Sequence, residues 1–202
     1  LKLQLTLQEQ GYIVRKRTDN LEAYDALLRG GAYYRRYTKE ANAQARQLFE
    51  KAVALDPQYA DAYMGLSSTY FAERVLRWSA DPQTPERAFE LAQKAVALDD
   101  SSPIAHAVLS EIYALKQQSD QAIAEVERAI ALNPNDANIY ECQADVLNRA
   151  GRPEEALRAV EQAMRLNPHY PPIDLFHLGQ AYRLTGRYAE AIATLKELIS
   201  RN

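Results

Sequence analysis

The stretch RAIALNPND, residues 128–136, recurs in closely similar form along the chain. Its counterparts are KAVALDPQY at 51–59, KAVALDDSS at 94–102 and QAMRLNPHY at 162–170. Each combines a small residue, apolar residues at helical spacing and an Asp or Asn followed by Pro or Asp. Because Pro cannot continue a helix and disfavours helical geometry at the residue before it, this sequence pattern is typical of a helix end. The sequence therefore predicts that one type of helix end is repeated along the chain.

The repetition has a fixed period of 34 residues in its clearest part. Ala122 and Pro134 recur as Ala156 and Pro168, and the residues around them keep their size class. This spacing resembles the tetratricopeptide repeat, whose pattern is W-x2-L-G-x2-Y, then A-x3-F, then P. The resemblance implies an all-α fold, a right-handed α-solenoid of antiparallel helix pairs with about five repeats. Such pairs stack because a single pair cannot bury its own apolar face.

The repeat pattern also gives the expected domain boundaries. Residues 1–19 are expected to be the end of an N-terminal helix and a linker, and residues 20–202 the repeat array. The repeats fall at about 20–59, 60–102, 103–136, 137–170 and 171–202. Gly151 and Gly186 stand where a helix would end in the left-handed conformation that glycine favours.

The second repeat carries an insertion at 71–84. We expect it to lengthen the first helix of the repeat and then to turn at Asp81 and Pro82, with Thr84 capping the next helix and Pro85 at its first position. The insertion holds Trp78, the only Trp of the chain. Trp78 either packs on the adjoining helices or is a contact point for a partner, because Trp is enriched at interface hot spots.

Composition excludes several classes of protein. With 47% hydrophobic and 25% charged residues, the 202-residue chain can bury a core. The net charge is −3 and the basic cluster at 15–17 is short, so we expect no nucleic-acid binding. No apolar run is long enough for a membrane span, and we expect no membrane insertion and a cytoplasmic location. The single cysteine cannot form an intramolecular disulfide.

Candidate catalytic and metal-binding residues do not form a recognisable set. His106 falls at a large inward position and is expected in the core, while His169 and His177 are poorly spaced for a metal pair. No histidine is placed by the sequence to activate Cys142. We therefore expect no catalytic residue, cofactor or metal in this segment.

The expected functional surface is a groove for a protein or peptide partner. In tetratricopeptide arrays the first helices of successive repeats line a concave groove, and the resemblance carries those positions onto this chain. Each residue can equally be an ordinary solvated side chain, but together they are the candidate peptide site. The candidates are Tyr24, Leu27, Tyr34, Arg35, Met64, Ser68, Phe71, Glu111, Asn138, Glu141, Asp145, Asn148, Arg149, Phe176, Gln180 and Arg183.

Two positions in the first helix of each repeat also show whether the chain belongs to the subclass that binds chaperone C-termini. Arrays that clamp the C-terminal carboxylate of chaperones use Lys, Asn and Arg at these positions, whereas this chain has residues such as Met64, Glu111 and Glu141 there. We therefore expect no carboxylate clamp.

A resemblance to a more specific family rests on residues outside the repeat consensus. The stretches at 1–30, 38–63 and 78–100 are similar to the C-terminal region of bacterial class III adenylate/guanylate cyclases. The resemblance implies a non-catalytic interaction module, the regulatory or recruitment region of a signalling cyclase. The alternative is a self-association module that promotes dimerisation of the parent enzyme.

The last helix predicts an exposed edge. Ile192, Leu195, Leu198 and Ile199 recur at helical spacing, and only part of this stripe can pack within its own repeat. We expect the native protein to extend beyond both ends of this sequence. We also expect a possible homo-oligomer through the C-terminal helix edge, because burying one such side chain contributes roughly 1.5–3 kcal/mol.

Overall fold

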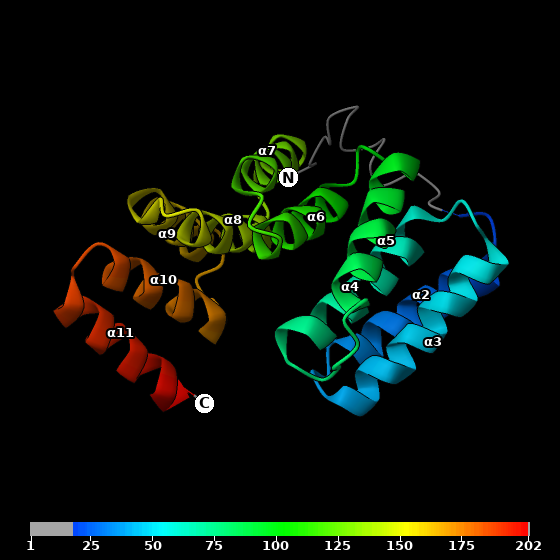
Figure 1. Ribbon diagram of the computed structural model, residues 1–202, viewed down its shortest axis with the longest axis horizontal. Coiled ribbons are helices and arrows are strands. Elements are labelled where there is room, and N and C mark those ends of the chain that lie inside the picture. Colours follow the sequence, from blue (N-terminus) through cyan, green and yellow to red (C-terminus); the bar gives the residue numbers. More distant parts are fainter. Residues whose placement is uncertain (1–17, 202) are drawn as a thin grey trace, which may run out of the picture.

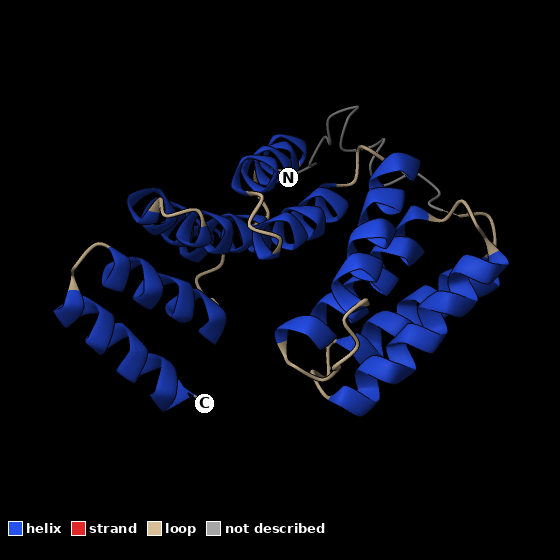
Figure 2. Cartoon of the chain, in the orientation of Figure 1, coloured by secondary structure: helices blue, strands red, loops and turns tan. Residues whose placement is uncertain are grey.

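The structure, a computed structural model, describes residues 18–201, and every regular element in that range is an α-helix (Figure 2). The predicted N-terminal helix end and most of the linker, at 1–17, lie outside the described residues. The helices are α2 (Leu21–Tyr34), α3 (Lys39–Leu55), α4 (Ala60–Val75), α5 (Thr84–Leu98), α6 (Pro103–Leu115), α7 (Ser119–Leu132), α8 (Ala137–Arg149), α9 (Pro153–Leu166), α10 (Pro172–Leu184) and α11 (Tyr188–Arg201). The prediction of an all-α solenoid of about five helix pairs is confirmed.

The helix pairs follow one another along a curved array. Figure 1 shows an arch with α2 and α3 at one end and α10 and α11 at the other. The first helices of successive pairs, α2, α4, α6, α8 and α10, each contact the next one along the array. The second helices α3, α5, α7 and α9 each pack between their own first helix and the next, and α11 packs on α10. The first helices therefore form one continuous face of the array.

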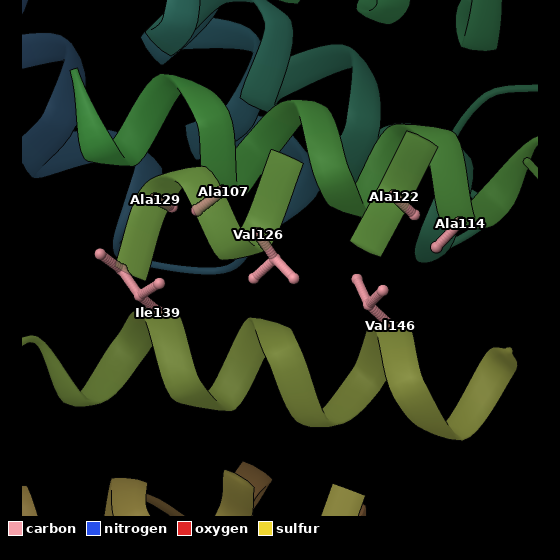
Figure 3. Close-up of a cluster of buried hydrophobic side chains, with 7 residues drawn as sticks. All are labelled: Ala107, Ala114, Ala122, Val126, Ala129, Ile139 and Val146. Carbon is pink, nitrogen blue, oxygen red and sulfur yellow. The ribbon is translucent and has the colours of Figure 1, made fainter. Parts of the chain in front are cut away.

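The repeated small residues explain how neighbouring pairs share a core. Figure 3 shows side chains of three consecutive helices, α6, α7 and α8, meeting in one cluster. Alanines at these positions allow the helix backbones to approach, and the β-branched side chains fill the remaining space. The cluster joins the third repeat to the fourth. Its members are Ala107, Ala114, Ala122, Val126, Ala129, Ile139 and Val146.

Two positions near the start of the array must be glycine, because an aromatic ring lies directly against the backbone there. The ring of Phe49, a residue of α3 that is only 3% exposed, lies between Gly30 of α2 and Gly65 of α4. A Cβ atom would lie 2.6 Å from the ring at Gly30 and 2.7 Å from it at Gly65. The ring therefore fills a space that exists only because both helices lack a side chain there.

In the turn that joins the two helices of each repeat, one residue adopts the left-handed backbone conformation. Gly151 and Gly186 have φ values of 73° and 76°, as the sequence predicted. The matching turns of the other repeats place Tyr37, Arg77 and Gln117 in the same region, with φ values of 51°, 56° and 60°. The sequence did not indicate these three positions, because none of them is a glycine. The stacking of the helices imposes this turn whatever residue stands there.

The insertion differs from the prediction in its cap. Helix α4 ends at Val75, and the chain turns before α5 begins at Thr84. Thr84 is therefore the first helical residue, the cap is Gln83, and no side chain caps this end. The Thr84 hydroxyl instead donates a hydrogen bond to the Ser79 hydroxyl at 3.2 Å, and the side chain is buried inside the turn. Trp78 is half-buried, and its role as a contact point stays a prediction.

Candidate peptide-binding groove

A groove of about 770 Å³ runs along the face formed by the first helices. Its walls come mainly from α2, α4, α6, α8 and α10, so residues far apart in the sequence share one surface. Most of the residues expected from the repeat pattern line it. These are Leu27, Tyr34, Arg35, Met64, Ser68, Phe71, Glu111, Glu141, Asp145, Arg149 and Phe176.

The remaining five candidates, Tyr24, Asn138, Asn148, Gln180 and Arg183, are not part of the lining. Two of them have structural roles instead. The Asn148 amide is buried and donates a hydrogen bond to the His177 carbonyl at 3.0 Å, which links α8 to α10. The Asn138 amide donates to the Asp136 carboxylate at 3.1 Å, beside the N-terminus of α8.

The groove also contains residues that the repeat pattern did not select. Ile104 of α6 and Ile173 of α10 line it and are 43% and 42% exposed, and Leu28, Val108 and His177 line it as well. Large apolar side chains at exposed helix positions were a signal that could have identified Ile104 and Ile173. No comparable signal marked His177, because its groove neighbours come from other repeats.

Aromatic and aliphatic side chains form the apolar part of the groove. Tyr34 and Phe71 are half-buried and also pack against core residues, while Phe176 is 38% exposed. Replacing Phe176 with Ala should therefore leave stability nearly unchanged, as is usual at exposed helix positions. Truncating Tyr34 or Phe71 would also remove core packing, which costs more than a change at an exposed position.

Carboxylates from α6 and α8 form the polar part. Asp145 accepts a hydrogen bond from Nε of Arg149 at 2.7 Å, and Glu141 lies 2.9 Å from Nε2 of His177. Glu111 faces these groups from α6 and makes no hydrogen bond or ion pair with the described residues. This part of the groove thus contains two partnered carboxylates and one without a partner.

The environment of Glu111 disfavours its charged form. Burial is the main cause, the charges of Glu141 and Asp145 add to it, and Arg149 opposes it, so that the pKa of Glu111 rises to about 8. The phenol of Tyr34 on α2 faces Glu111, and burial together with this carboxylate raises the pKa of Tyr34 above its ordinary value. The apolar and polar parts of the groove are therefore close enough to influence each other electrostatically.

The histidine and cysteine residues considered for catalysis are buried or partnered by neighbouring groups. His106 is buried as expected, with Nδ1 2.6 Å from Glu125 and Nε2 2.8 Å from the Asp100 carbonyl. Burial, followed by the nearby carboxylates, raises the pKa of the Cys142 thiol well above its ordinary value, which disfavours the reactive thiolate. Within residues 18–201, no group of three or more His, Cys, Asp or Glu side chains is arranged to hold a metal ion.

Stacked antiparallel helix pairs with a groove along their first helices define an α-solenoid. The chain belongs to the tetratricopeptide repeat family. One family model described as tetratricopeptide repeat matches residues 35–103 and 116–171, and a second model with the same description matches residues 147–202. The matched ranges include most of the described helices.

Solved structures agree with this family. TTC0263, a thermophilic TPR protein of Thermus thermophilus, superposes with a TM-score of 0.71 at 24% identity, over 88% of this chain and 90% of that one. YrrB, described as a TPR protein with an unusual peptide-binding site, superposes with a TM-score of 0.57 at 18% identity, over 96% and 91% of the two chains. At such identities these likenesses show the fold alone.

A curated relative is a longer protein. It is named "Putative adenylate cyclase 3" of Rhizobium meliloti (strain 1021), and it is 31% identical over 123 residues. The match covers 60% of this chain but 21% of the relative. No helix in the described part of the chain is both long enough and apolar enough to cross a membrane.

Proposed function

We propose that this chain is a non-catalytic protein-interaction module whose groove binds a peptide segment of a partner protein. The observation that carries the proposal is the groove itself, of about 770 Å³, to which all five first helices contribute. Ligand sites are concave and mainly apolar with a few polar groups, and this groove has that composition. YrrB, described as having a peptide-binding site, shares the fold, which is consistent with the proposal.

We further propose that the module is the regulatory or recruitment region of a bacterial signalling cyclase. The sequence resemblance and the curated relative both support this assignment. In the parent chain, the groove would bring a partner to the enzyme, and cyclic-nucleotide synthesis would be carried out elsewhere in the protein.

A selection from random peptides tests the groove directly. Dodecapeptides displayed on phage are selected against the protein, and the affinities of the selected peptides are measured by fluorescence anisotropy. Phe176→Ala should weaken binding by about tenfold or more, because Phe176 is an exposed aromatic side chain that lines the groove. Tyr188→Ala is the matched control, since Tyr188 is an exposed aromatic of α11 that does not line the groove. If no peptide is selected, or if Phe176→Ala and Tyr188→Ala bind equally well, the groove is not the site.

Self-association is the second candidate function, and the surface of α11 favours it. Ile192 is 57% exposed and Ile199 is 75% exposed on this last described helix, whereas Leu195 and Leu198 are half-buried. Leu195 packs against Gly179 of α10. Light scattering over a wide range of concentrations tests this function, and a constant monomer mass would contradict it.

A further inference from the structure

The carboxylates of the groove differ in what they already bind. Glu141 is held by His177 and Asp145 by Arg149, with contact distances of 2.9 Å and 2.7 Å. Glu111 is half-buried between them and Tyr34, and it contacts no cation among the described residues. A carboxylate in such surroundings is stabilised by a cation within about 4–6 Å. Within residues 18–201, the groove thus has an acidic position that no cation contacts directly, and Arg149 acts on it only at longer range.

His177, which contacts two of these carboxylates, is an independent sign that the groove contains an unsatisfied polar group. The residue is 4% exposed and its side chain lines the groove. Its Nε2 atom lies 2.9 Å from Oε1 of Glu141. Nδ1 has no hydrogen-bond partner within the described residues, and its contact with the Asp145 carboxylate, at 3.7 Å, is too long for one. A buried polar atom without a hydrogen-bond partner is costly, and a polar group of a ligand in the groove would supply that partner.

We infer that the groove recognises an arginine side chain of the partner peptide, whose guanidinium lies at Glu111 while an adjacent apolar side chain packs against the aromatic residues Tyr34, Phe71 and Phe176. Arginine fits because its guanidinium carries a permanent charge and five N–H donors in one plane. Lysine has the same charge but fewer donors and a different shape, so it should bind more weakly. The inference deepens the proposed function and rests on it.

The same geometry disfavours acidic peptides. A peptide carboxylate at this position would meet Glu111, Glu141 and Asp145, and Arg149 is already engaged with Asp145. Arg35 also lines the groove, at the end of α2, and its charge is not among those that shift the pKa of Glu111. The charge preference at Glu111 is therefore opposite to that of arrays that clamp a C-terminal carboxylate.

Proton linkage gives the inference a second readout. Since the pKa of Glu111 is about 8 without a ligand, this carboxyl is mostly protonated at pH 7, and a bound guanidinium would favour its ionised form. Affinity for an arginine peptide should therefore rise several-fold from about pH 7 to about pH 8.5. The groups that face Glu111 are Tyr34, Glu141, Cys142, Asp145 and Arg149, and raised pKa values keep Tyr34 and Cys142 neutral in this range.

The test uses the peptides selected from the random library. Arginine should be enriched at one position at least about fivefold over Asp and Glu, and replacing that arginine with citrulline, which keeps the shape but loses the charge, should weaken binding about tenfold. Glu111→Gln should abolish the difference between the arginine and citrulline peptides and the pH dependence. Glu161→Gln, an exposed position on α9, is the matched control and should change neither.

The outcomes separate the inference from the proposed function. If peptides bind in a manner that depends on Phe176 but show no arginine preference, or if Glu111→Gln has no effect on the arginine preference, the inference is overturned and the proposed function stands. Selection of acidic peptides would also overturn the inference. If no peptide binds, or if binding does not depend on Phe176, the proposed function itself fails.

Discussion

Gly30 and Gly31 are adjacent in one helix, yet the structure predicts opposite effects of replacing them with alanine. In a helix interior, alanine is more favourable than glycine by about 1 kcal/mol. At Gly31, a Cβ atom would lie 3.4 Å from Nη1 of Arg35, which is the mobile end of an exposed side chain. Gly31→Ala should therefore leave stability unchanged or increase it by up to about 1 kcal/mol.

At Gly30 the same methyl group would lie 2.6 Å from the ring of Phe49. The ring cannot move away, because Gly65 is already in contact with it on the other side and the side chain is 3% exposed. Overpacking of a core costs about 1–3 kcal/mol, and this enclosure favours the upper part of that range. After the gain in helix propensity is subtracted, Gly30→Ala should lower the free energy of unfolding by about 1–2 kcal/mol. The two variants should differ by about 2–3 kcal/mol.

Urea unfolding followed by far-ultraviolet circular dichroism measures this difference. The comparison requires that the free energy of unfolding depends equally steeply on urea concentration in both variants. A third variant isolates the cause. In a Phe49→Leu background the smaller side chain should reduce the penalty of Gly30→Ala, which a double-mutant cycle reports as a coupling energy of about 1 kcal/mol or more. If Gly30→Ala is as stable as Gly31→Ala, or if the coupling is zero, the ring is not enclosed as described.

Three further predictions concern a turn, the groove and the last helix. Gln117→Gly should raise the free energy of unfolding by about 0.5–1 kcal/mol and Gly151→Ala should lower it by about 1 kcal/mol, because both positions have positive φ; urea unfolding that gives the opposite signs would contradict this. Glu111 has a pKa raised above that of the unfolded chain, so its contribution to stability is full at low pH and is lost as pH rises from about 4.5 to 8. Glu111→Gln should therefore be more stable than the parent protein by at least about 1 kcal/mol above a pH of about 8, and equal stability at that pH would refute it. Ile199→Lys should abolish any self-association seen by sedimentation while leaving the melting curve unchanged, since this side chain is 75% exposed; association that persists would place the contact elsewhere.

The helix boundaries and the pairing of helices followed from the sequence, because they depend on local patterns. The Asp-Pro and Asn-Pro endings predicted where second helices stop, and α3, α7 and α9 end at Leu55, Leu132 and Leu166, directly before those residues. The alanines of the 34-residue period predicted the shared core that joins α6, α7 and α8. Most of the residues expected in the groove do line it, since their positions repeat with the same period, and their role in binding stays a prediction.

Contacts between repeats were decided only by the tertiary structure. Curvature of the array brings Tyr34 of α2 toward Glu111 of α6, and it places His177 against Glu141, 36 residues earlier in the chain. The left-handed turn at Gln117 likewise follows from the stacking of helices, and no glycine marked it. A period fixes which residues of one repeat face inward, because that depends on the 3.6-residue turn of a helix. The chemistry of the groove depends on the rotation from one repeat to the next, which is the sum of all the packing contacts between them, and a single repeat of the sequence does not contain it.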